Sequence, residues 1–326
     1  MNMKSAIPLA VFGKCSYPDQ TADGEPDPIR PRPEPSDPHG AITMNRILEK
    51  RQLSAEVFRM TFDAPNIARE RRAGQFLIIQ LDTQVGERIP LTIADADAVK
   101  GSVTIIFQAV GETTHRLAEF KVGDEIRNVL GPLGQPTHIK NFGRALCVGG
   151  GIGAAPLHPI AQALKAAGNE VSIVIGARNK ELLIMEEEMR RISSDLTIVT
   201  DDGSAGRKAL VTAPLKEACE GPKPPDIVVA IGPPVMMKFC AETTRPFGVH
   251  TVVSLNTIMI DGTGMCGGCR VTVGGQTKFV CVDGPEFDGH KVDFDNMILR
   301  LGAYKPQEKE AHHRCHLDLN IAGEVR

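Results

Sequence analysis

Short, continuous runs of apolar residues alternate with helix-like segments between Arg144 and Thr243, and this alternation constrains the fold more than any other feature. Strands that are buried on both faces of a parallel sheet have unbroken apolar runs. Strands with one solvent-exposed face alternate between apolar and polar residues. The expected strands are Ala145–Val148, Val171–Ile175, Leu196–Val199 and Ile227–Ile231. The helices expected between them are Pro156–Ala167, Leu182–Ile192 and Pro234–Thr243. This alternation predicts a doubly wound parallel sheet, the usual form of a nucleotide-binding domain.

A different pattern precedes this region, from Asn45 to about Lys140. Short runs of alternating character are separated by turn residues, as in Val57–Phe62, Phe76–Leu81 and Val103–Phe107. Strands at this spacing predict a small antiparallel barrel. The fold class is therefore expected to be β followed by α/β.

Composition marks the remaining boundaries of the 326-residue chain, which is long enough for two or three domains. Residues 17–38 contain seven of the 23 prolines among Asp, Glu, Gly and Arg, so we expect a disordered extension over residues 1–43. The other expected domains are a barrel over 44–140, a nucleotide-binding domain over 141–249, and a Gly- and Cys-rich segment with a polar tail over 250–326.

Charge and hydropathy exclude several classes of protein. Lys and Arg number 37 and Asp and Glu 40, so the net charge is −3 and nothing indicates a nucleic-acid footprint. No apolar run approaches the roughly 20 residues of a membrane span. The stretch Met1–Cys15 has a short apolar run but no small-residue cleavage site, so we expect a cytoplasmic protein rather than a secreted one.

A glycine-rich turn follows the first expected strand of the parallel sheet and opens a helix. Glycines at such a turn let backbone N–H groups approach a pyrophosphate at the helix N-terminus. A tight strand-to-helix turn needs glycine for steric reasons too, so the motif alone leaves both interpretations open. The candidate nucleotide residues of this turn are Gly149, Gly150, Gly151, Gly153 and Pro156.

Further candidates follow other strands of the same sheet. Ligands of open α/β sheets lie beyond the carboxyl ends of the strands, so residues after different strands meet at one edge. Gly232 and Pro233 follow the strand that we expect to be the last one. Arg178 follows the second strand, and Asp201 and Asp202 follow the third. These three charged side chains are candidates for binding ribose or a 2′-phosphate. The alternative is that they are solvated charges of loops. The sequence therefore leaves both NAD(H) and NADP(H) open as the nucleotide.

Three motifs in the barrel region are each only a turn or capping signal when taken singly: Gly86–Thr92, Gly111–Thr114 and Gly131–Gly134. Their order before a nucleotide-binding half resembles the ferredoxin–NADP reductase superfamily. The resemblance implies FAD, with its ring and ribityl chain beside Arg88, Pro90, Leu91 and Thr92 and its phosphates beside Gly111, Thr113 and Thr114. The chain departs from the superfamily in two places, because Leu91 replaces a stacking Tyr and Arg88 stands one residue further from the proline.

Asp261, Cys266, Cys269 and Cys281 have the spacing D-x4-C-x2-C-x11-C in a Gly-rich window. This spacing matches the plant-type framework of a [2Fe–2S] cluster, with Asp in the first ligand position. The final Cys is expected in a strand or turn beyond a hairpin of residues 271–280. A zinc site with the same four ligands and a redox dithiol of Cys266 and Cys269 are the alternatives.

The other cysteines have no partner at ligand spacing. Cys147 lies inside an expected strand and is interpreted as a core thiol. Cys219, Cys240 and Cys315 are interpreted as structural or surface thiols.

The segments Asp261–Arg270 and Cys281–His290 resemble one family closely, as do Thr200–Gly206 and Met236–Lys238. This family contains the small subunits of bifurcating NADH-dependent ferredoxin:NADP oxidoreductases and the beta subunits of sulfide dehydrogenases. The electron-transfer subunits of dihydroorotate dehydrogenases are related, but they carry Cys where this chain has Asp261. The resemblance covers about residues 44–315. It implies FAD, a [2Fe–2S] cluster held by one Asp and three Cys, and a nicotinamide site. It also implies a larger partner subunit with another FAD and [4Fe–4S] clusters, and ferredoxin as a further partner through the complex.

These features predict a subunit that exchanges hydride between NAD(P)H and FAD and passes single electrons through the cluster. No side chain is expected to act as a catalytic acid or base. Two alternatives remain: a dihydroorotate-type electron conduit with a TIM-barrel partner, and a non-enzymatic redox sensor.

Overall fold

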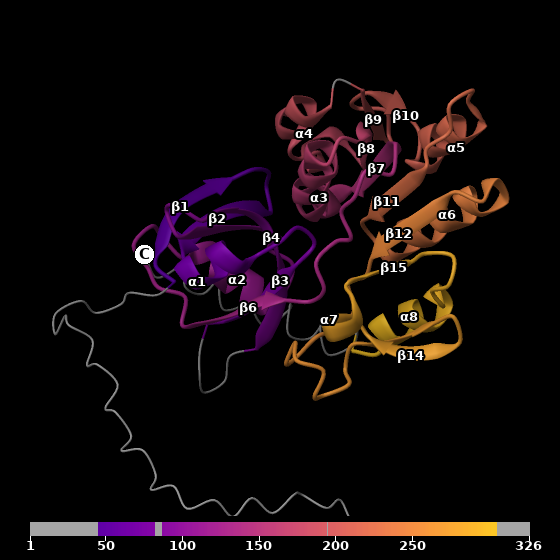
Figure 1. The fold of residues 1–326 in the computed structure, drawn as a ribbon. Coiled ribbons are helices and arrows are strands. Elements are labelled where there is room, and N and C mark those ends of the chain that lie inside the picture. The colour runs from indigo at the N-terminus through magenta and orange to yellow at the C-terminus, as the bar shows by residue number, and fades with distance from the viewer. Residues whose placement is uncertain (1–44, 82–86, 194, 305–326) are drawn as a thin grey trace, which may run out of the picture. The chain divides into compact units, whose positions relative to one another are not determined.

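Three β-sheets organise the residues that the computed structural model describes, which are 45–81, 87–193 and 195–304 (Figure 1). The expected disordered extension over residues 1–43, the polar tail after Tyr304 and the Cys315 thiol lie outside these ranges. Within them, no helix has both the length and the apolar character that crossing a membrane requires.

The first sheet is antiparallel and has the strand order β1-β2-β5-β4-β3-β6. Its strands are β1 (Ile47–Gln52), β2 (Val57–Asp63), β3 (Phe76–Gln80), β4 (Arg88–Asp97), β5 (Ser102–Gln108) and β6 (Asn128–Leu133). The backbone N–H of Ile47 donates to Asp124 O at 2.8 Å, and the Gly123 N–H donates to Ile47 O at 2.9 Å. These bonds join β1 to the segment before β6, so the sheet closes on itself. Two short helices, α1 (Pro65–Glu70) and α2 (Glu112–Glu119), accompany it.

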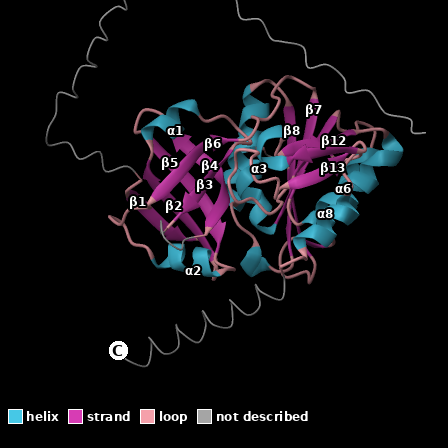
Figure 2. Ribbon diagram, turned by 90° about the horizontal axis from the view of Figure 1, so that it is seen from below, coloured by secondary structure: helices cyan, strands magenta, loops and turns pink. Residues whose placement is uncertain are grey.

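The second sheet has the order β10-β9-β8-β7-β11-β12-β15 and is parallel except for β15. Its strands are β7 (Arg144–Gly150), β8 (Glu170–Ala177), β9 (Leu196–Thr200), β10 (Arg207–Lys208), β11 (Ile227–Ile231), β12 (His250–Ser254) and β15 (Glu286–Asp288). One face packs against α3 (Ala154–Ala166) and α4 (Glu186–Ile192), and the other against α5 (Thr212–Glu220) and α6 (Pro234–Thr244). The doubly wound sheet is thus confirmed, and Figure 2 shows α3 between it and the antiparallel sheet.

Two expectations about this sheet are wrong. The expected helix Leu182–Ile192 is interrupted: a 3₁₀ turn covers Lys180–Leu182, and α4 begins only at Glu186. The reason is Met185, whose backbone is left-handed with φ of 61° and so cannot continue a helix. The strand ending at Ile231 is also not the last strand, because β12 and β15 extend the sheet beyond it.

The third sheet is the hairpin of β13 (Arg270–Val273) and β14 (Gln276–Phe279), which confirms the expected hairpin. Its two-residue turn is Gly274-Gly275, with φ of 57° and 77°, as tight hairpin turns require. Helices α7 (Val280–Asp283) and α8 (Phe294–Leu301) follow. Buried side chains of this region pack into the core of the second sheet, although we expected little core here: Cys269, Val271, Val280, Phe294 and Met297.

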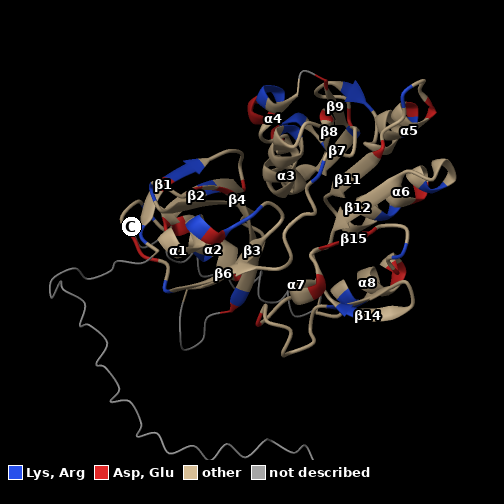
Figure 3. Cartoon of the chain, in the orientation of Figure 1, with Lys and Arg blue, Asp and Glu red and all other residues tan. Residues whose placement is uncertain are grey.

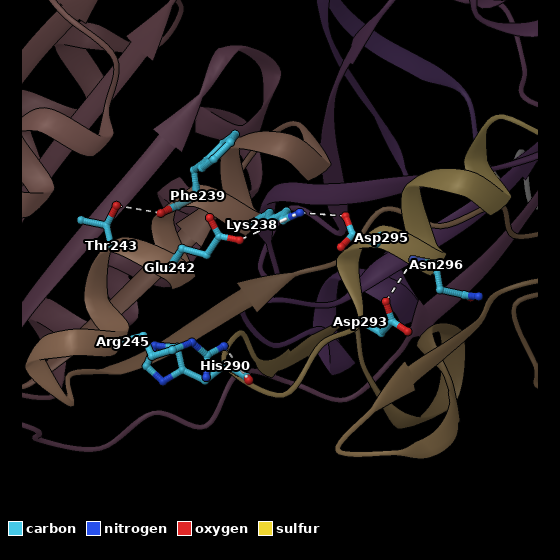
Figure 4. A network of polar contacts seen from close by, with 9 residues as sticks. All are labelled: Lys238, Phe239, Glu242, Thr243, Arg245, His290, Asp293, Asp295 and Asn296. Carbon is cyan, nitrogen blue, oxygen red and sulfur yellow. Dashed lines mark hydrogen bonds and ion pairs between the residues drawn. The ribbon is translucent and has the colours of Figure 1, made fainter.

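Polar contacts attach this C-terminal region to α6 (Figure 4). Lys238 Nζ lies 2.7 Å from Asp295 Oδ1 on α8. Beyond the end of α6, in the 3₁₀ turn Arg245–Phe247, the Arg245 guanidinium donates to His290 O at 2.8 Å. Figure 3 marks Lys and Arg in blue and Asp and Glu in red, and both signs occur on α6 and on α8. Helix α6 therefore contacts the C-terminal region along its length.

Candidate functional site

A cavity of about 910 Å³ lies where the antiparallel sheet meets the carboxyl ends of the parallel strands. This size is within the range of small-molecule and cofactor sites. The predicted residues that line it are Pro90, Leu91, Thr92, Thr114, Gly150, Gly151, Gly153, Pro156, Arg178, Asp201, Gly232 and Pro233. Sequence reasoning missed other lining residues, including Phe76, Met236, Ser254, Asn256, Met259 and Pro285. The fold thus brings the expected flavin and nucleotide motifs to one cavity.

Five predicted residues are not among those that line the cavity: Arg88, Gly111, Thr113, Gly149 and Asp202. Three of them form hydrogen bonds with other residues of the protein. The Thr113 hydroxyl donates to Glu87 Oε2 at 2.7 Å, and the Gly111 N–H donates to Thr114 Oγ1 at 3.0 Å. Asp202 Oδ1 accepts from the Ser204 hydroxyl at 2.6 Å, and this bond holds the pKa of Asp202 below its ordinary value. Gly149 lies within β7, and Arg88 is the first residue of β4.

The glycines of the turn after β7 have different reasons to be glycine. A Cβ on Gly150 would lie 2.2 Å from Met236 Sδ, and one on Gly153 would lie 2.3 Å from Ile231 O. At these two positions the start of α6 and the end of β11 pack directly on the glycine-rich turn. Gly151 differs, because its φ is +54° and nothing lies within 4 Å of a Cβ placed there. Gly151 therefore has open space beside it, and its left-handed backbone rather than a neighbouring atom favours glycine there.

The barrel side of the cavity combines an apolar surface with hydroxyl groups. Leu91 and Thr92 of β4 lie opposite Leu77 and Phe76 of β3 in the ladder. Leu91, Thr92 and Phe76 line the cavity, and Leu91 is the residue that the sequence predicts in the place of a stacking Tyr. An apolar wall with a few placed polar groups suits a flavin ring and its chain.

The four candidate cluster ligands form two pairs in the structure. Cys269 Sγ and Cys281 Sγ are 3.2 Å apart, and both residues are 1% exposed. Cys266 Sγ lies 3.4 Å from Asp261 Oδ1 in the exposed part of the loop. Cys281 lies in helix α7, so the expectation of a strand or turn is wrong. Among the described residues, no three His, Cys, Asp or Glu side chains converge on a point that could hold a single metal ion.

The backbone around these pairs suits an iron–sulfur cluster. Gly262, Gly264 and Gly267 have φ of 74°, 85° and 67°, so the loop wraps through conformations that side chains disfavour. Backbone N–H groups point at sulfur: Gly268 N is 3.4 Å from Cys266 Sγ, and Cys281 N is 3.5 Å from Cys269 Sγ. Hydrogen bonds to the sulfurs help to set the reduction potential of an iron–sulfur cluster. Three thiols and a carboxylate also supply the four ligands that a [2Fe–2S] cluster requires.

Asp261 is held in the ionised form that a ligand needs. Partial desolvation opposes ionisation, but hydrogen bonds from Thr263 and Cys266 outweigh it and lower the pKa of Asp261 to about 2. Asp261 Oδ2 accepts from Cys266 N at 3.0 Å and from Met265 N at 2.9 Å. The carboxylate thus organises the first turn of the loop.

The segment of residues 261–284 carries the four candidate ligands and is called the cluster loop below. It packs against the barrel. A Cβ on Gly262 would lie 2.8 Å from Leu133 Cδ1 of β6 and 3.0 Å from Ile78 Cγ1 of β3. Gln135, just after β6, donates from its backbone N to Gly284 O at 2.7 Å and from its side chain to Val282 O at 2.9 Å. Sequence reasoning missed Gln135, which has no local motif. These contacts place the flavin barrel and the cluster loop side by side.

A closed antiparallel sheet, a doubly wound sheet and a cysteine-containing loop define an oxidoreductase of the ferredoxin-reductase type with an iron–sulfur domain. Residues 147–242 match the oxidoreductase NAD-binding domain, and residues 256–293 match the iron–sulfur cluster binding domain of dihydroorotate dehydrogenase B. The chain belongs to the family of dihydroorotate dehydrogenase B electron transfer subunits.

Individual relatives support this membership. A Thermotoga maritima protein named as a homolog of the NAD(+)-dependent dihydroorotate dehydrogenase B electron transfer subunit is 50% identical over 285 residues, 87% of this chain and 99% of the relative. The electron transfer subunit of Caldanaerobacter subterraneus is 34% identical over 253 residues, 76% of this chain and 97% of the relative. A chain from the structure of an NADH-dependent reduced ferredoxin-NADP oxidoreductase, which was determined to study flavin-based electron bifurcation, is 49% identical. Its TM-score is 0.79, over 84% of this chain and 99% of that one.

More distant structures support the fold alone. The cytochrome b5 reductase domain of Ulva prolifera nitrate reductase is 17% identical, with a TM-score of 0.53 over 62% of this chain and 92% of that domain. The reductase fold and the two domain matches agree with the expected cofactors: FAD, NAD and an iron–sulfur cluster. They favour iron–sulfur over zinc in the loop, and an oxidoreductase subunit over a sensor.

Proposed function

We propose that the chain exchanges hydride between NAD(P)H and FAD and passes single electrons through a [2Fe–2S] cluster to a larger partner subunit. The observation that carries this proposal is the arrangement of the three sites. The flavin and nucleotide motifs line one cavity, and the cluster loop packs on the barrel that forms one wall of it. A nicotinamide exchanges two electrons as hydride and an iron–sulfur centre exchanges one, and a flavin converts between the two.

In this proposal the chain supplies position rather than acid–base chemistry. Leu91, Thr92 and Thr114 would hold the flavin, and the turn at Gly151 would hold the pyrophosphate of the nucleotide. Arg178 and Asp201, both on the cavity wall, would bind the ribose or its 2′-phosphate. Asp261, Cys266, Cys269 and Cys281 would ligate the cluster. The proposed domain limits are those expected from the sequence, except that β12 and β15 complete the nucleotide-binding sheet.

An electron transfer subunit implies a larger partner. We propose that this partner carries another FAD and [4Fe–4S] clusters and connects the chain to ferredoxin, as the similarity to the ferredoxin-NADP oxidoreductase chain supports. The match to the dihydroorotate dehydrogenase B iron–sulfur domain favours a second candidate, a dihydroorotate-type partner. Co-purification from the native host decides between them: iron–sulfur in the partner supports the first, and dihydroorotate oxidation supports the second. We also propose that the chain acts in the cytoplasm, as expected from its sequence.

The direct test is a visible and EPR spectrum of anaerobically purified protein with iron and flavin quantified. The expected result is one FAD and two irons per chain, with a flavin band that bleaches on addition of NADH or NADPH. A colourless preparation that contains zinc would contradict the proposal.

Replacing Asp261 by cysteine tests the unusual ligand. Thiolate donates more electron density to iron than carboxylate does, so Asp261→Cys should retain the cluster and lower its midpoint potential, by an amount on the order of 100 mV. An EPR-monitored redox titration measures the shift. If the potential and the EPR signal both stay as in the wild type, Asp261 is not a ligand.

A further inference from the structure

Glu286 brings together three segments that lie far apart in the sequence. It begins β15, and its Oε1 accepts a hydrogen bond of 2.5 Å from the Thr137 hydroxyl, which follows the barrel. Gly74, in the turn before β3, closes over this pair. A Cβ on Gly74 would lie 2.2 Å from Thr137 Oγ1 and 2.8 Å from Glu286 Oε1, so only glycine leaves room for the bond.

This carboxyl is next to residues of the cavity wall and close in the chain to a candidate cluster ligand. Its sequence neighbour Pro285 and its partner in the ladder, Ser254, both line the cavity. Cys281 precedes it by only five residues, a separation of at most about 18 Å for an extended chain. The helical turn of α7 shortens that reach further. At a separation of this order, a unit of charge on the cluster would change the free energy of ionising a partly buried carboxyl.

No cation balances Glu286 among the residues that the structure describes. It forms none of the ion pairs found there, and Thr137 is its one side-chain partner in the hydrogen bonds found there. Burial raises the pKa of Glu286 to about 7, although the Thr137 bond opposes this shift. A carboxyl in this position exchanges a proton near neutral pH, because its charged form is poorly compensated.

Other titratable side chains lie on the elements around Glu286. Cys147 of β7 feels the charge of Glu286, but burial raises the pKa of this thiol to about 12, so it stays neutral. Arg71, in the segment that carries Gly74, forms an ion pair with Asp95 Oδ1 at 3.3 Å. His138, beside Thr137, packs edge-on against the Phe142 ring, and His250 stands at the opposite end of β12 from Ser254.

We propose that Glu286 takes up a proton from solvent when the cluster accepts an electron. This inference rests on the proposed function, which supplies the electron from NAD(P)H through the flavin. One electron reduces the cluster, and one proton from water forms an O–H bond on the Glu286 carboxylate. The region around Glu286 and the cluster thereby gains no net charge.

The test is an EPR-monitored redox titration of the cluster in the full chain at several pH values, for wild type and Glu286→Gln. Glutamine can still accept the Thr137 hydrogen bond but cannot ionise. Because reduction takes up a proton, the wild-type midpoint potential should fall as pH rises above about 7, the pKa of Glu286 with the oxidised cluster. In Glu286→Gln the potential should not depend on pH over this range. Asp288→Asn is the matched control, since this carboxylate of the same strand is paired with Lys291 at 3.2 Å, and it should keep the wild-type slope.

A wild-type potential that does not change with pH, or an equal slope in Glu286→Gln, overturns the inference. Should the glutamine variant not fold, Thr137→Val provides a second test, because loss of the bond that lowers the pKa of Glu286 should move the sloping region to higher pH. An unmoved region in that variant also overturns it. A purified chain with no cluster signal or no flavin would instead contradict the proposed function, so the two failures are distinguishable.

Discussion

Replacing Cys269 by serine is expected to abolish electron transfer beyond the flavin while leaving reduction of the flavin by NADH or NADPH nearly unchanged. Cys269 is 1% exposed and lies 3.2 Å from Cys281 Sγ, at the buried end of the cluster loop. A serine hydroxyl is a far poorer iron ligand than thiolate, so the cluster should be lost or unstable. Because Cys269 is not among the residues that line the cavity, the flavin and nucleotide sites should persist.

Two rates measured on the same preparation separate these effects. Flavin reduction is followed by stopped-flow absorbance after mixing with NADH or NADPH, and electron output by reduction of the partner complex. Output should fall by roughly two orders of magnitude or more, as expected when a ligand rather than its outer-shell support is removed. Cys219→Ser is the matched control, because Cys219 is a buried thiol of α5 outside the loop. Equal loss of both rates in Cys269→Ser would contradict the separation of the two steps.

The parts of the fold that could be predicted are those with a local signal. Strands β7, β8 and β11 are mostly buried on both faces, so each is marked by a largely apolar run. Strand β15 has only three residues, and its pairing with β12 depends on a chain segment more than thirty residues away. No pattern within those three residues distinguishes a strand from a loop.

The same distinction applies to the candidate site. The glycine turn after β7 could be found because its sequence signal and its position at the cavity coincide. Asp202 stays a prediction: its carboxylate accepts from Ser204 two residues away, and Asp202 is not among the residues that line the cavity. Glu286 could not be found, because its surroundings come from Gly74 and Thr137, and neither stands near it in the sequence. Local chemistry is visible in a sequence, whereas burial assembled by distant segments is not.

The attachment of the cluster loop explains why a single chain can carry all three sites. The loop contacts the barrel through Gly262 and Gln135, and α8 contacts α6 through Asp295 and Lys238. The surface ion pair contributes at most about 1 kcal/mol. The apolar core shared by the C-terminal region and the second sheet must therefore supply most of the attachment. A rigid attachment keeps the distance between flavin and cluster constant, and electron transfer depends on that distance.

Placing a negative charge at Gly151 should have the second large effect, on the nucleotide rather than the cluster. Gly151 has φ of +54°, and nothing lies within 4 Å of a Cβ placed there, so a side chain would extend into the open space of the cavity wall. Asp and Asn tolerate this backbone region better than other side chains do. Gly151→Asp would therefore set a carboxylate against the pyrophosphate, and like charges so close cost several kcal/mol.

The expected result for Gly151→Asp is a KM for NADH or NADPH raised about 100-fold or more, which corresponds to roughly 3 kcal/mol. Gly151→Asn is the matched control, because it has the same shape without the charge and should raise KM much less. Flavin content and the cluster EPR signal should equal those of the wild type in both variants, since no protein atom lies within 4 Å of a Cβ placed at Gly151. Similar KM values for the Asp and Asn variants would show that the pyrophosphate does not bind at this turn.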